Sequence, residues 1–441
     1  MKRFLLSLAL VFASFAVVAA ADSNRAEWRF AKKQTDSARR FLATGYYPND
    51  VGIEGSALSF HHRGRRLKGV LDSKGFPTAQ STKGDYWLFE VPVEALAAGS
   101  VVDVFIPFTG NAGENNSFMF EYRDGKKWHS ALPVTSTSSH KHPRRLWQSV
   151  RLERAVAEGG KVALRLRQTE KSAVEFTVAC PSLRGQQPQI VLYDNATPRD
   201  TVRVLFLGNS YTYYYTYPVI FKEIAWREGH YADCSIFISG GYTMAQHLAN
   251  QHSVELVDKG GYDYVMLQDQ SVLPLLNGTA DDAAMTENLK KVVERVEKSS
   301  PDAKVFVEIT WGRRFGNNNL GQYEKYAEKY PHFFTDYDAM QNRLIENITA
   351  EAEQCNIDLH PLGLAWQIVM HERPDISLYH TDNHHQSYAG SYLSAAVAYL
   401  VVYGEKFGEN PADCQLDSQT AAYLRAVAER VVLGGEKWSE K

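Results

Sequence analysis

Cysteine is scarce in this chain of 441 residues, which has four: Cys180, Cys234, Cys355 and Cys414. No two of them form a Cys-x-x-Cys pair, so the sequence gives no support to a zinc ribbon or a thioredoxin-type redox site. Four cysteines in a chain of this length are also sparse for a disulfide framework. We expect buried thiols or one incidental bridge.

An excess of charge of either sign is also missing, because 48 basic and 51 acidic residues leave a formal charge of −3. Binding to nucleic acid needs a basic surplus, so no nucleic acid partner is expected. After the first 21 residues no apolar run is long enough to span a bilayer, so no stable membrane insertion is expected. With 44% hydrophobic and 22% charged residues, the composition is that of a folded protein with room for two or three domains.

The first 21 residues have the pattern of a cleaved signal peptide. Lys2 and Arg3 precede a mostly apolar run from Phe4 to Val18, and three alanines end at Ala21. The run is short for an uncleaved membrane anchor, which is the alternative. We therefore expect cleavage near Ala21 and a secreted or periplasmic mature protein.

Residues 22–195 are expected to form an accessory domain, a jelly-roll-like β-sandwich. From about residue 85 to 193, apolar residues alternate with others, as in an antiparallel sheet with one buried face. Turn signals such as Gly159-Gly160 separate these runs, and short strands at such intervals are typical of a sandwich. The alternating residues include Val102, Val104, Ile106, Phe108, Phe118, Phe120, Val162, Leu164, Leu166, Val174, Phe176 and Val178.

Residues 196–441 have a different pattern, in which short apolar strands alternate with helices. The strands are expected at Val202–Leu207, Cys234–Ile238, Tyr264–Leu267, Val305–Ile309 and Ile357–Leu359. The helices are expected near Tyr217–Glu228, Asp281–Ser299, Ala339–Gln354, Ser387–Tyr403 and Ser418–Val432. This alternation predicts an α/β domain whose parallel sheet is covered on both faces, with its active site at the carboxyl ends of the strands.

A serine stands directly after the first of these strands, in Gly208-Asn209-Ser210-Tyr211-Thr212. A strand end preceded by glycine is where a parallel sheet can expose a nucleophile. The motif is not the G-x-S-x-G elbow, which occurs nowhere in the chain. A serine that only caps a helix is the alternative.

The polar stretch from His380 to His385 offers a partner for this serine. Asp382 and His385 are three residues apart, so the carboxylate can orient the imidazole, whose other nitrogen can accept the serine proton. One alternative is a metal cluster of His380, Asp382, His384 and His385, which lacks a distant partner with ligand spacing. Another is a solvated loop. We expect no cofactor.

Two further strand ends could stabilise an oxyanion. One carries Gly240-Gly241, whose backbone N–H groups can approach a substrate closely. The other is Gln268-Asp269-Gln270-Ser271, which can supply a side-chain amide. The glycines could equally form an ordinary turn, and the glutamines could belong to a surface loop.

These motifs, in this order, resemble the SGNH (GDSL-type) hydrolase family. Gly208 to Thr212 is similar to the first block, usually G-D-S-x-T, with asparagine in place of aspartate. Gly241-Tyr242-Thr243 is similar to the second block, and Asp382-x-x-His385 to the last. The form with G-N-S-x-T further resembles an uncharacterised bacterial subgroup. The resemblance covers about residues 200–405.

The resemblance implies a flavodoxin-like three-layer α/β/α fold and a catalytic triad of Ser210, Asp382 and His385. It also implies an oxyanion hole that uses the backbone of Ser210 and Gly241. The third block, usually G-x-N-D, is absent here. The register against it favours Gln270 as the side-chain donor, with Gln268 as the alternative.

Further residues are candidates for substrate binding. Trp311 and Arg313 follow the fourth strand, where the indole could stack on a sugar and the guanidinium could bind an anionic group. Packing in the wall of the site is the alternative for both. His247 could line the pocket or lie in the core. Tyrosines from 211 to 217 could form an aromatic rim or fix the first helix onto the sheet.

The sequence thus favours a secreted serine esterase that removes O-acyl groups, above all acetyl groups, from carbohydrate. Its expected partner is an acylated glycan or another small ester. A lipase or thioesterase on longer or different acyl chains is one competing hypothesis. A second competing hypothesis is a glycan-binding protein with a degenerate hydrolase domain. The altered third block favours this hypothesis, whereas the complete set of Ser210, Asp382 and His385 argues against it.

Overall fold

The computed structural model describes residues 24–28, 30, 35–48, 51–72, 76–110, 118–124, 127–134, 144–169, 174–178, 188–195, 200–276, 280–316 and 336–437. The chain divides into two compact units, Met1–Thr197 and Pro198–Lys441. The signal peptide expected at residues 1–21, and Cys180, lie outside the described residues. Among the described residues, Cys234, Cys355 and Cys414 form no disulfide bond.

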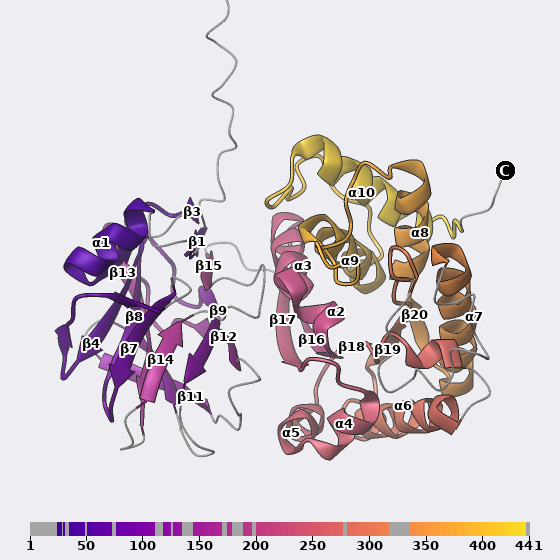
Figure 1. The fold of residues 1–441 in the computed structure, drawn as a ribbon, viewed down its shortest axis with the longest axis horizontal. Helices are drawn as coiled ribbons and strands as arrows, with labels where there is room; N and C mark the ends of the chain where they lie inside the picture. Colours follow the sequence, from indigo (N-terminus) through magenta and orange to yellow (C-terminus); the bar gives the residue numbers. More distant parts are fainter. Residues whose placement is uncertain are drawn as a thin grey trace, which may run out of the picture. The chain divides into compact units, whose positions relative to one another are not determined.

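The described part of the first unit contains two antiparallel sheets (Figure 1). One has the order β3-β1-β15-β9-β14-β7-β6, and β12 also pairs with β9; the other has the order β11-β10-β13-β8-β4-β2, and β5 also pairs with β4. A short helix, α1 (Asp36–Thr44), follows the N-cap Thr35. The strands of the first sheet are β1 (Arg25–Glu27), β3 (Val51–Gly52), β6 (Val70–Leu71), β7 (Pro77–Ser81), β9 (Val101–Gly110), β12 (Arg144–Arg151), β14 (Val174–Val178) and β15 (Gln189–Tyr193). Those of the second are β2 (Tyr46–Pro48), β4 (Ala57–His62), β5 (Arg65–Arg66), β8 (Tyr86–Pro92), β10 (Phe118–Asp124), β11 (Lys127–Val134) and β13 (Lys161–Gln168).

Both sheets contribute to one hydrophobic cluster. The alternating residues of β9, such as Val104 and Ile106, are buried in it together with Trp87 and Phe89 of β8. The alternating residues of β9 face this cluster, but Val101, Asp103 and Phe105 on its other face are buried as well, so the expectation of one exposed face is wrong for this strand.

The second unit contains a five-stranded parallel sheet with the order β17-β16-β18-β19-β20. Numbered along the chain within this unit, the order is 2-1-3-4-5, which is flavodoxin-like. The prediction of a parallel α/β domain is confirmed. The strands are β16 (Thr201–Gly208), β17 (Tyr231–Ile238), β18 (Tyr264–Leu267), β19 (Lys304–Glu308) and β20 (Asp358–His360).

Helices cover both faces of this sheet (Figure 1). Successive residues of β16 point to opposite faces, so Val204 and Phe206 join one hydrophobic cluster, whereas Leu205 and Leu207 join another. The first cluster contains residues of α3 (Tyr217–Arg227), α8 (Leu362–Glu372), α9 (Tyr388–Tyr403) and α10 (Ser418–Val432). The second contains residues of α4 (Met244–Ala249), α5 (Gln251–Lys259), α6 (Ala280–Ser299) and α7 (Tyr337–Cys355).

Side-chain caps begin several of these helices. Ser387 accepts a hydrogen bond from the N–H of Gly390 at the start of α9, and Asp417 accepts one from Thr420 at the start of α10. The sequence pattern does not predict α4, α5 and α8. In the part of the chain that the structure covers, no helix combines the length and apolarity that crossing a membrane requires.

Candidate active site

Ser210 lies at the junction of β16 and a short helix, α2 (Ser210–Tyr213), which the 3-10 turn η1 (Tyr214–Thr216) continues. Gly208 ends the strand in a crowded position. A Cβ atom there would lie 2.2 Å from the hydroxyl oxygen of Thr212. The strand end therefore requires glycine, and the chain turns at once so that the half-buried Ser210 stands at the carboxyl edge of the sheet.

Asn209 is buried and joins three strand ends. Its Oδ1 accepts from the backbone N–H of Tyr211 at 3.1 Å, which caps α2. Its Nδ2 donates to the carbonyl oxygens of Tyr242 at 2.9 Å and Asp269 at 3.2 Å, which follow β17 and β18. An aspartate, usual at this place in the similar family, has no N–H to donate.

Asp382 and His385 form a hydrogen-bonded pair. The ring Nδ1 of His385 lies 2.9 Å from Asp382 Oδ2, and the backbone N–H groups of His384 and His385 donate to Asp382 Oδ1 at 3.0 and 2.9 Å. Burial by itself would raise the pKa of Asp382, but these hydrogen bonds outweigh it and lower the pKa to about 2. The aspartate is thus ionised and can hold the proton on Nδ1 of His385.

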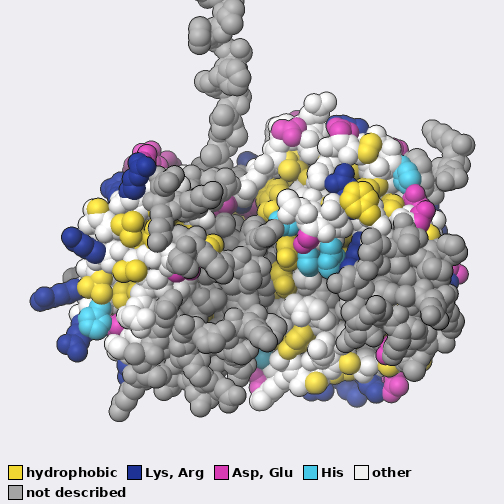
Figure 2. All heavy atoms as spheres, in the orientation of Figure 1, with side chains coloured by type: hydrophobic (Ala, Val, Ile, Leu, Met, Phe, Trp, Pro, Cys, Tyr) yellow, Lys and Arg dark blue, Asp and Glu magenta, His cyan; other side chains and the backbone are white. Residues whose placement is uncertain are grey.

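His385 can act as a base in its neutral form. Burial lowers its pKa, Asp382 opposes that shift, and the nearby charge of Arg313 adds to it. With Nδ1 donating to Asp382, Nε2 is left as an acceptor. Burial and Arg313 also lower the pKa of His384, to about 3. Figure 2 shows histidine side chains gathered on the second unit, beside an acidic and a basic side chain.

The loop that carries His385 packs on the helix that begins at Ser210. The rings of Tyr214 and His385 stack with centroids 3.9 Å apart and planes within 4°. Next to His385, the buried side chain of Gln386 donates to the carbonyl oxygens of Tyr211 at 2.6 Å and Tyr214 at 3.0 Å. Gln386 is a site residue to which no motif in the sequence points. The structure therefore places the loop of the predicted base against the segment that follows the predicted nucleophile, although no hydrogen bond joins Ser210 Oγ to His385 among the interactions of the described residues.

Two backbone N–H groups are available at this edge. Within the described part of the chain, the N–H groups of Ser210 and Gly241 have no hydrogen-bond acceptor. Gly241 has a φ of +70°, which favours glycine, and a Cβ there would meet nothing within 4 Å. Both groups can therefore donate to an oxygen bound at the site.

The two candidate glutamines differ in their surroundings. Gln268 is buried; its Oε1 accepts from the N–H of Asn209 at 2.9 Å and the hydroxyl of Thr212 at 3.1 Å, and its Nε2 donates to the Asp269 carbonyl. The Oε1 of Gln270 accepts from Val272 and Leu273 at the start of the 3-10 turn η2 (Leu273–Leu276). In the described residues the Nε2 of Gln270 has no acceptor, so Gln270 is the better placed donor.

Three residues predicted to bind substrate are buried, so the structure favours the alternatives of wall and core packing over that prediction. Trp311 is 0% exposed and stacks between Tyr211 and Trp366, each with ring centroids 4.2 Å away. Tyr211 is 1% exposed. His247 lies in the core, where its nitrogens are 3.1 Å from Ser253 Oγ and 3.2 Å from the Gly208 carbonyl oxygen, and burial lowers its pKa to about 4. Each of these residues packs behind the site and supports it.

Arg313, the fourth residue predicted to bind substrate, is left partly accessible near the catalytic loop, as is Phe315, which the sequence does not predict. Arg313 is half-buried, and its charge acts on both His384 and His385. The next residue, Arg314, donates its backbone N–H to the Asn383 carbonyl oxygen at 3.1 Å, which ties this segment to the catalytic loop. The guanidinium carbon of Arg314 lies 5.4 Å from the ring centroid of Phe315. Phe315 is 62% exposed, which a sequence cannot reveal.

The metal alternative for the histidine loop has no geometric support. Among the residues that the structure describes, no group of three or more His, Cys, Asp or Glu side chains is arranged to hold a metal ion. The ring of His385 is instead engaged with Asp382, and that of His384 stacks on His385 with centroids 4.2 Å apart.

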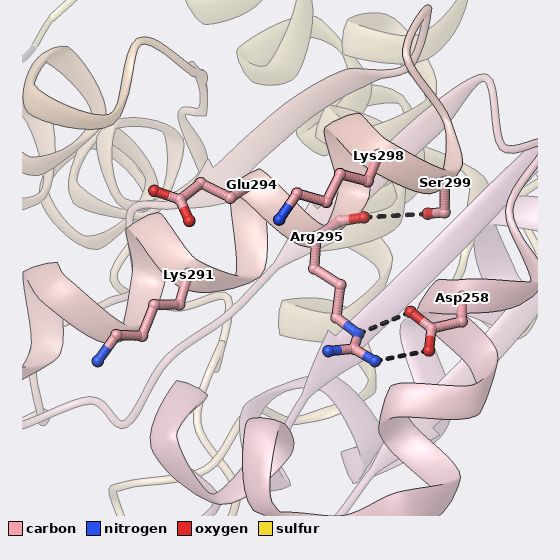
Figure 3. Close-up of a pocket in the computed structure, with 6 residues that line it drawn as sticks. All are labelled: Asp258, Lys291, Glu294, Arg295, Lys298 and Ser299. Carbon is pink, nitrogen blue, oxygen red and sulfur yellow. Dashed lines mark hydrogen bonds and ion pairs between the residues drawn. The ribbon is translucent and has the colours of Figure 1, made fainter.

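A surface groove elsewhere in the second unit is not part of this site. Figure 3 shows it between α5 and α6, with Lys291, Glu294 and Lys298 along its edge and Arg295 paired to Asp258 by two bonds of 2.7 and 2.6 Å. Asp258 and Ser299 lie in the last turns of α5 and α6, which lead into β18 and β19, so the groove lies near the amino ends of these strands. Ser210 stands at the carboxyl ends.

No protein-family model matches the chain, and neither does any curated protein. Solved structures are similar to it at low identity. A DUF4886 family protein from Bacteroides uniformis is 18% identical, with a TM-score of 0.44 over 55% of this chain and 98% of that one. A family two carbohydrate esterase from Clostridium thermocellum, in complex with cellohexaose, is 13% identical (TM-score 0.33; 79% and 98% covered). A lipase/acylhydrolase from Enterococcus faecalis is 15% identical (TM-score 0.34; 48% and 100% covered). The function proposed below therefore rests on the residues of this chain.

Proposed function

We propose that the chain is a secreted serine esterase of the SGNH type that removes O-acyl groups, above all acetyl, from carbohydrate. The observation that carries this proposal is the hydrogen bond of 2.9 Å between Asp382 and His385, on a loop whose His385 ring stacks on Tyr214, four residues after Ser210. The lowered pKa of each group favours an ionised carboxylate and a neutral imidazole. A structural ion pair would not require a neutral histidine beside a strand-end serine and two available N–H groups.

In the proposed reaction, Ser210 Oγ attacks the ester carbonyl while Nε2 of His385 accepts the hydroxyl proton. The N–H groups of Ser210 and Gly241 and the Nε2 of Gln270 donate to the oxygen that becomes negative. The imidazolium then gives its proton to the departing alcohol, and an acyl group remains on Ser210. Water, deprotonated by His385, hydrolyses that acyl-enzyme and restores the free serine.

Accessible side chains near the catalytic loop support a carbohydrate substrate. Phe315 presents an exposed ring, and aromatic rings can pack against the apolar faces of sugars. Arg313 adds a positive charge that suits an anionic group on the glycan. The expected signal peptide supports export to where polymeric glycans occur. We assign the first unit, with its two antiparallel sheets, as a β-sandwich accessory module of this esterase.

Hydrolysis of p-nitrophenyl acetate by wild type and Ser210→Ala tests this function. Wild type should be active, and the variant should lose several powers of ten in turnover without unfolding. A variant that keeps more than about a tenth of wild-type turnover would exclude Ser210 as the nucleophile. Wild type that is inactive on every acyl ester would favour a glycan-binding protein with a degenerate hydrolase domain.

Three further measurements define the acyl group, the glycan and the role of metal. A series of p-nitrophenyl esters with longer acyl chains should show a preference for acetyl, whereas a preference for long chains would indicate a lipase. Acetate release from a panel of acetylated polysaccharides should identify the glycan. Treatment with EDTA should leave activity unchanged, and its loss would restore the metal hypothesis for the histidine loop.

A further inference from the structure

Asp269 is a buried acid that the reaction above does not use, although it stands between the two candidate glutamines. Only 9% of the residue is exposed. Its Oδ1 accepts from the backbone N–H of Gln270 at 2.7 Å and from that of Met244 at 3.2 Å. Met244 begins α4, three residues after Gly241, so one carboxyl oxygen connects the loops that follow β17 and β18.

We propose that Asp269 is a positioning residue, which in its neutral form fixes the distance between the Gly241 and Gln270 donors. This inference rests on the proposed esterase function and deepens it. The backbone of Asp269 adds to the connection, because its carbonyl accepts from Asn209, which also donates to the Tyr242 carbonyl. Asp269 thus joins the two loops that carry the oxyanion donors.

The surroundings of the second carboxyl oxygen favour the neutral form. Asp269 Oδ2 is buried and has no partner among the described residues. Asp269 lines a cavity of about 10 Å³, about the least that holds one water. The same cavity is lined by Thr310 of the segment after β19, Glu308 of β19 and Glu351 of α7. The hydroxyl of Thr310 is likewise buried without a partner among these residues.

The described side chains that line this cavity include no cation that could compensate a charge on Asp269. Those from α6 and η2 are uncharged, and β19 and α7 contribute the acids Glu308 and Glu351. Burial raises the pKa of Asp269 to about 7, because its effect outweighs that of the hydrogen bonds from Gln270 and Met244, which lower the pKa. A neutral carboxyl can keep both acceptor bonds through Oδ1 and donate its proton into the cavity. An ionised one adds a negative charge behind the place where the oxyanion forms.

The proposal predicts the direction in which turnover changes with pH. Turnover should rise as His385 loses its proton, at a pH below its ordinary pKa of 6.5, and should fall again as Asp269 ionises near pH 7. Asp269→Asn keeps the acceptor oxygen and a donor in the cavity but cannot ionise. It should keep wild-type turnover at pH 6 and lose the decline at higher pH. A wild type without that decline, or an Asp269→Asn variant that retains it, would overturn the role of the neutral form.

Asp269→Ala tests the positioning role itself. It removes the shared acceptor, so kcat should fall about 10- to 100-fold with KM nearly unchanged. Asp263→Ala is a matched control, because Asp263 also accepts a backbone N–H, that of Arg203 at 2.7 Å, but at the opposite end of β18. The control should keep wild-type kcat. An Asp269→Ala variant with wild-type kcat would overturn the proposal.

Amide hydrogen exchange tests the connection without relying on activity. In Asp269→Ala, exchange should become faster at Met244 and Gln270 and remain unchanged at Arg203; in Asp263→Ala the pattern should be reversed. Unchanged exchange at Met244 and Gln270 would overturn the connection. If the wild type lacks esterase activity while exchange responds as expected, the proposed function fails and the connection between the loops stands.

Discussion

Replacing Asn209 by aspartate should weaken both the fold and the site, even though aspartate is usual at this position in the family that the sequence resembles. The side chain is 3% exposed, and its Nδ2 lies 2.9 and 3.2 Å from the carbonyl oxygens of Tyr242 and Asp269. An aspartate would place an oxygen against both carbonyls. Its Oδ1 could still accept from Tyr211, so the helix cap would survive.

The size of the expected loss of stability follows from the hydrogen-bond donors that Asn209→Asp removes. The Asp269 carbonyl retains the bond from Gln268, whereas the Tyr242 carbonyl loses its donor from Asn209. A buried acceptor left without a donor costs about 1–3 kcal/mol; the Tyr242 carbonyl is partly buried, which places it at the lower end, and repulsion between the new oxygen and both carbonyls adds to that cost. We expect the free energy of unfolding to fall by about 2–4 kcal/mol. Because the loop of Gly241 loses an anchor, kcat should fall about 100-fold.

The assay is urea unfolding together with steady-state hydrolysis of p-nitrophenyl acetate. Asn250→Asp is the matched control, since Asn250 caps α5 by accepting from His252 and Ser253, each at 3.1 Å. That capping role suits aspartate equally well, so the control should stay within about 0.5 kcal/mol of wild type. If Asn209→Asp behaves like the control in stability and turnover, the network that we describe around Asn209 does not hold the site together.

Three further predictions concern the same unit. His385→Ala should lower turnover as far as Ser210→Ala, and His384→Ala much less, because the ring of His385, unlike that of His384, is hydrogen-bonded to Asp382. Kinetics in which His384→Ala alone is inactive would exchange their roles. Gln270→Glu keeps the acceptor oxygen but removes the amide donor, so it should lower kcat about 100- to 1,000-fold. Gln268→Ala should instead lower the free energy of unfolding by about 1–3 kcal/mol. If Gln268→Ala lowers kcat and Gln270→Glu lowers only the stability, Gln268 is the donor. Asp269 binds its proton more tightly in the folded than in the unfolded state, so its contribution to the free energy of unfolding should fall by up to about 4 kcal/mol as the pH rises from 4 to 7. The difference between wild type and Asp269→Asn in thermal unfolding measures this contribution, because the opposite contributions of His247 and His384 are common to both proteins. Equal pH dependence of the two proteins would contradict it.

The strands and the main site motifs could be predicted because each depends on local pattern. The apolar run that becomes β16 predicts a buried strand, and its end predicts the place of Ser210. The spacing of Asp382 and His385 predicts their pairing, which the structure contains at 2.9 Å. The helix α9 is apolar on all sides and is still recognisable from its length and its Ser387 cap.

Further features depend on contacts between distant residues, which a pattern cannot reveal. Trp311 and Tyr211 follow strand ends, as substrate-binding residues do, but their rings stack on each other inside the wall of the site. Gln386 donates to Tyr211, 175 residues away, and Asn209 to Asp269, 60 residues away. Short helices such as α4 and α5 escaped prediction because each has few turns over which a period can repeat.

The most direct test of the central claim is to trap the nucleophile. A fluorophosphonate probe should form a covalent adduct on Ser210, identified by mass spectrometry of peptides, in step with the loss of p-nitrophenyl acetate hydrolysis. The adduct should form far more slowly in His385→Ala, because the serine then lacks its base. An adduct on another residue, or full inactivation without modification of Ser210, would contradict the account.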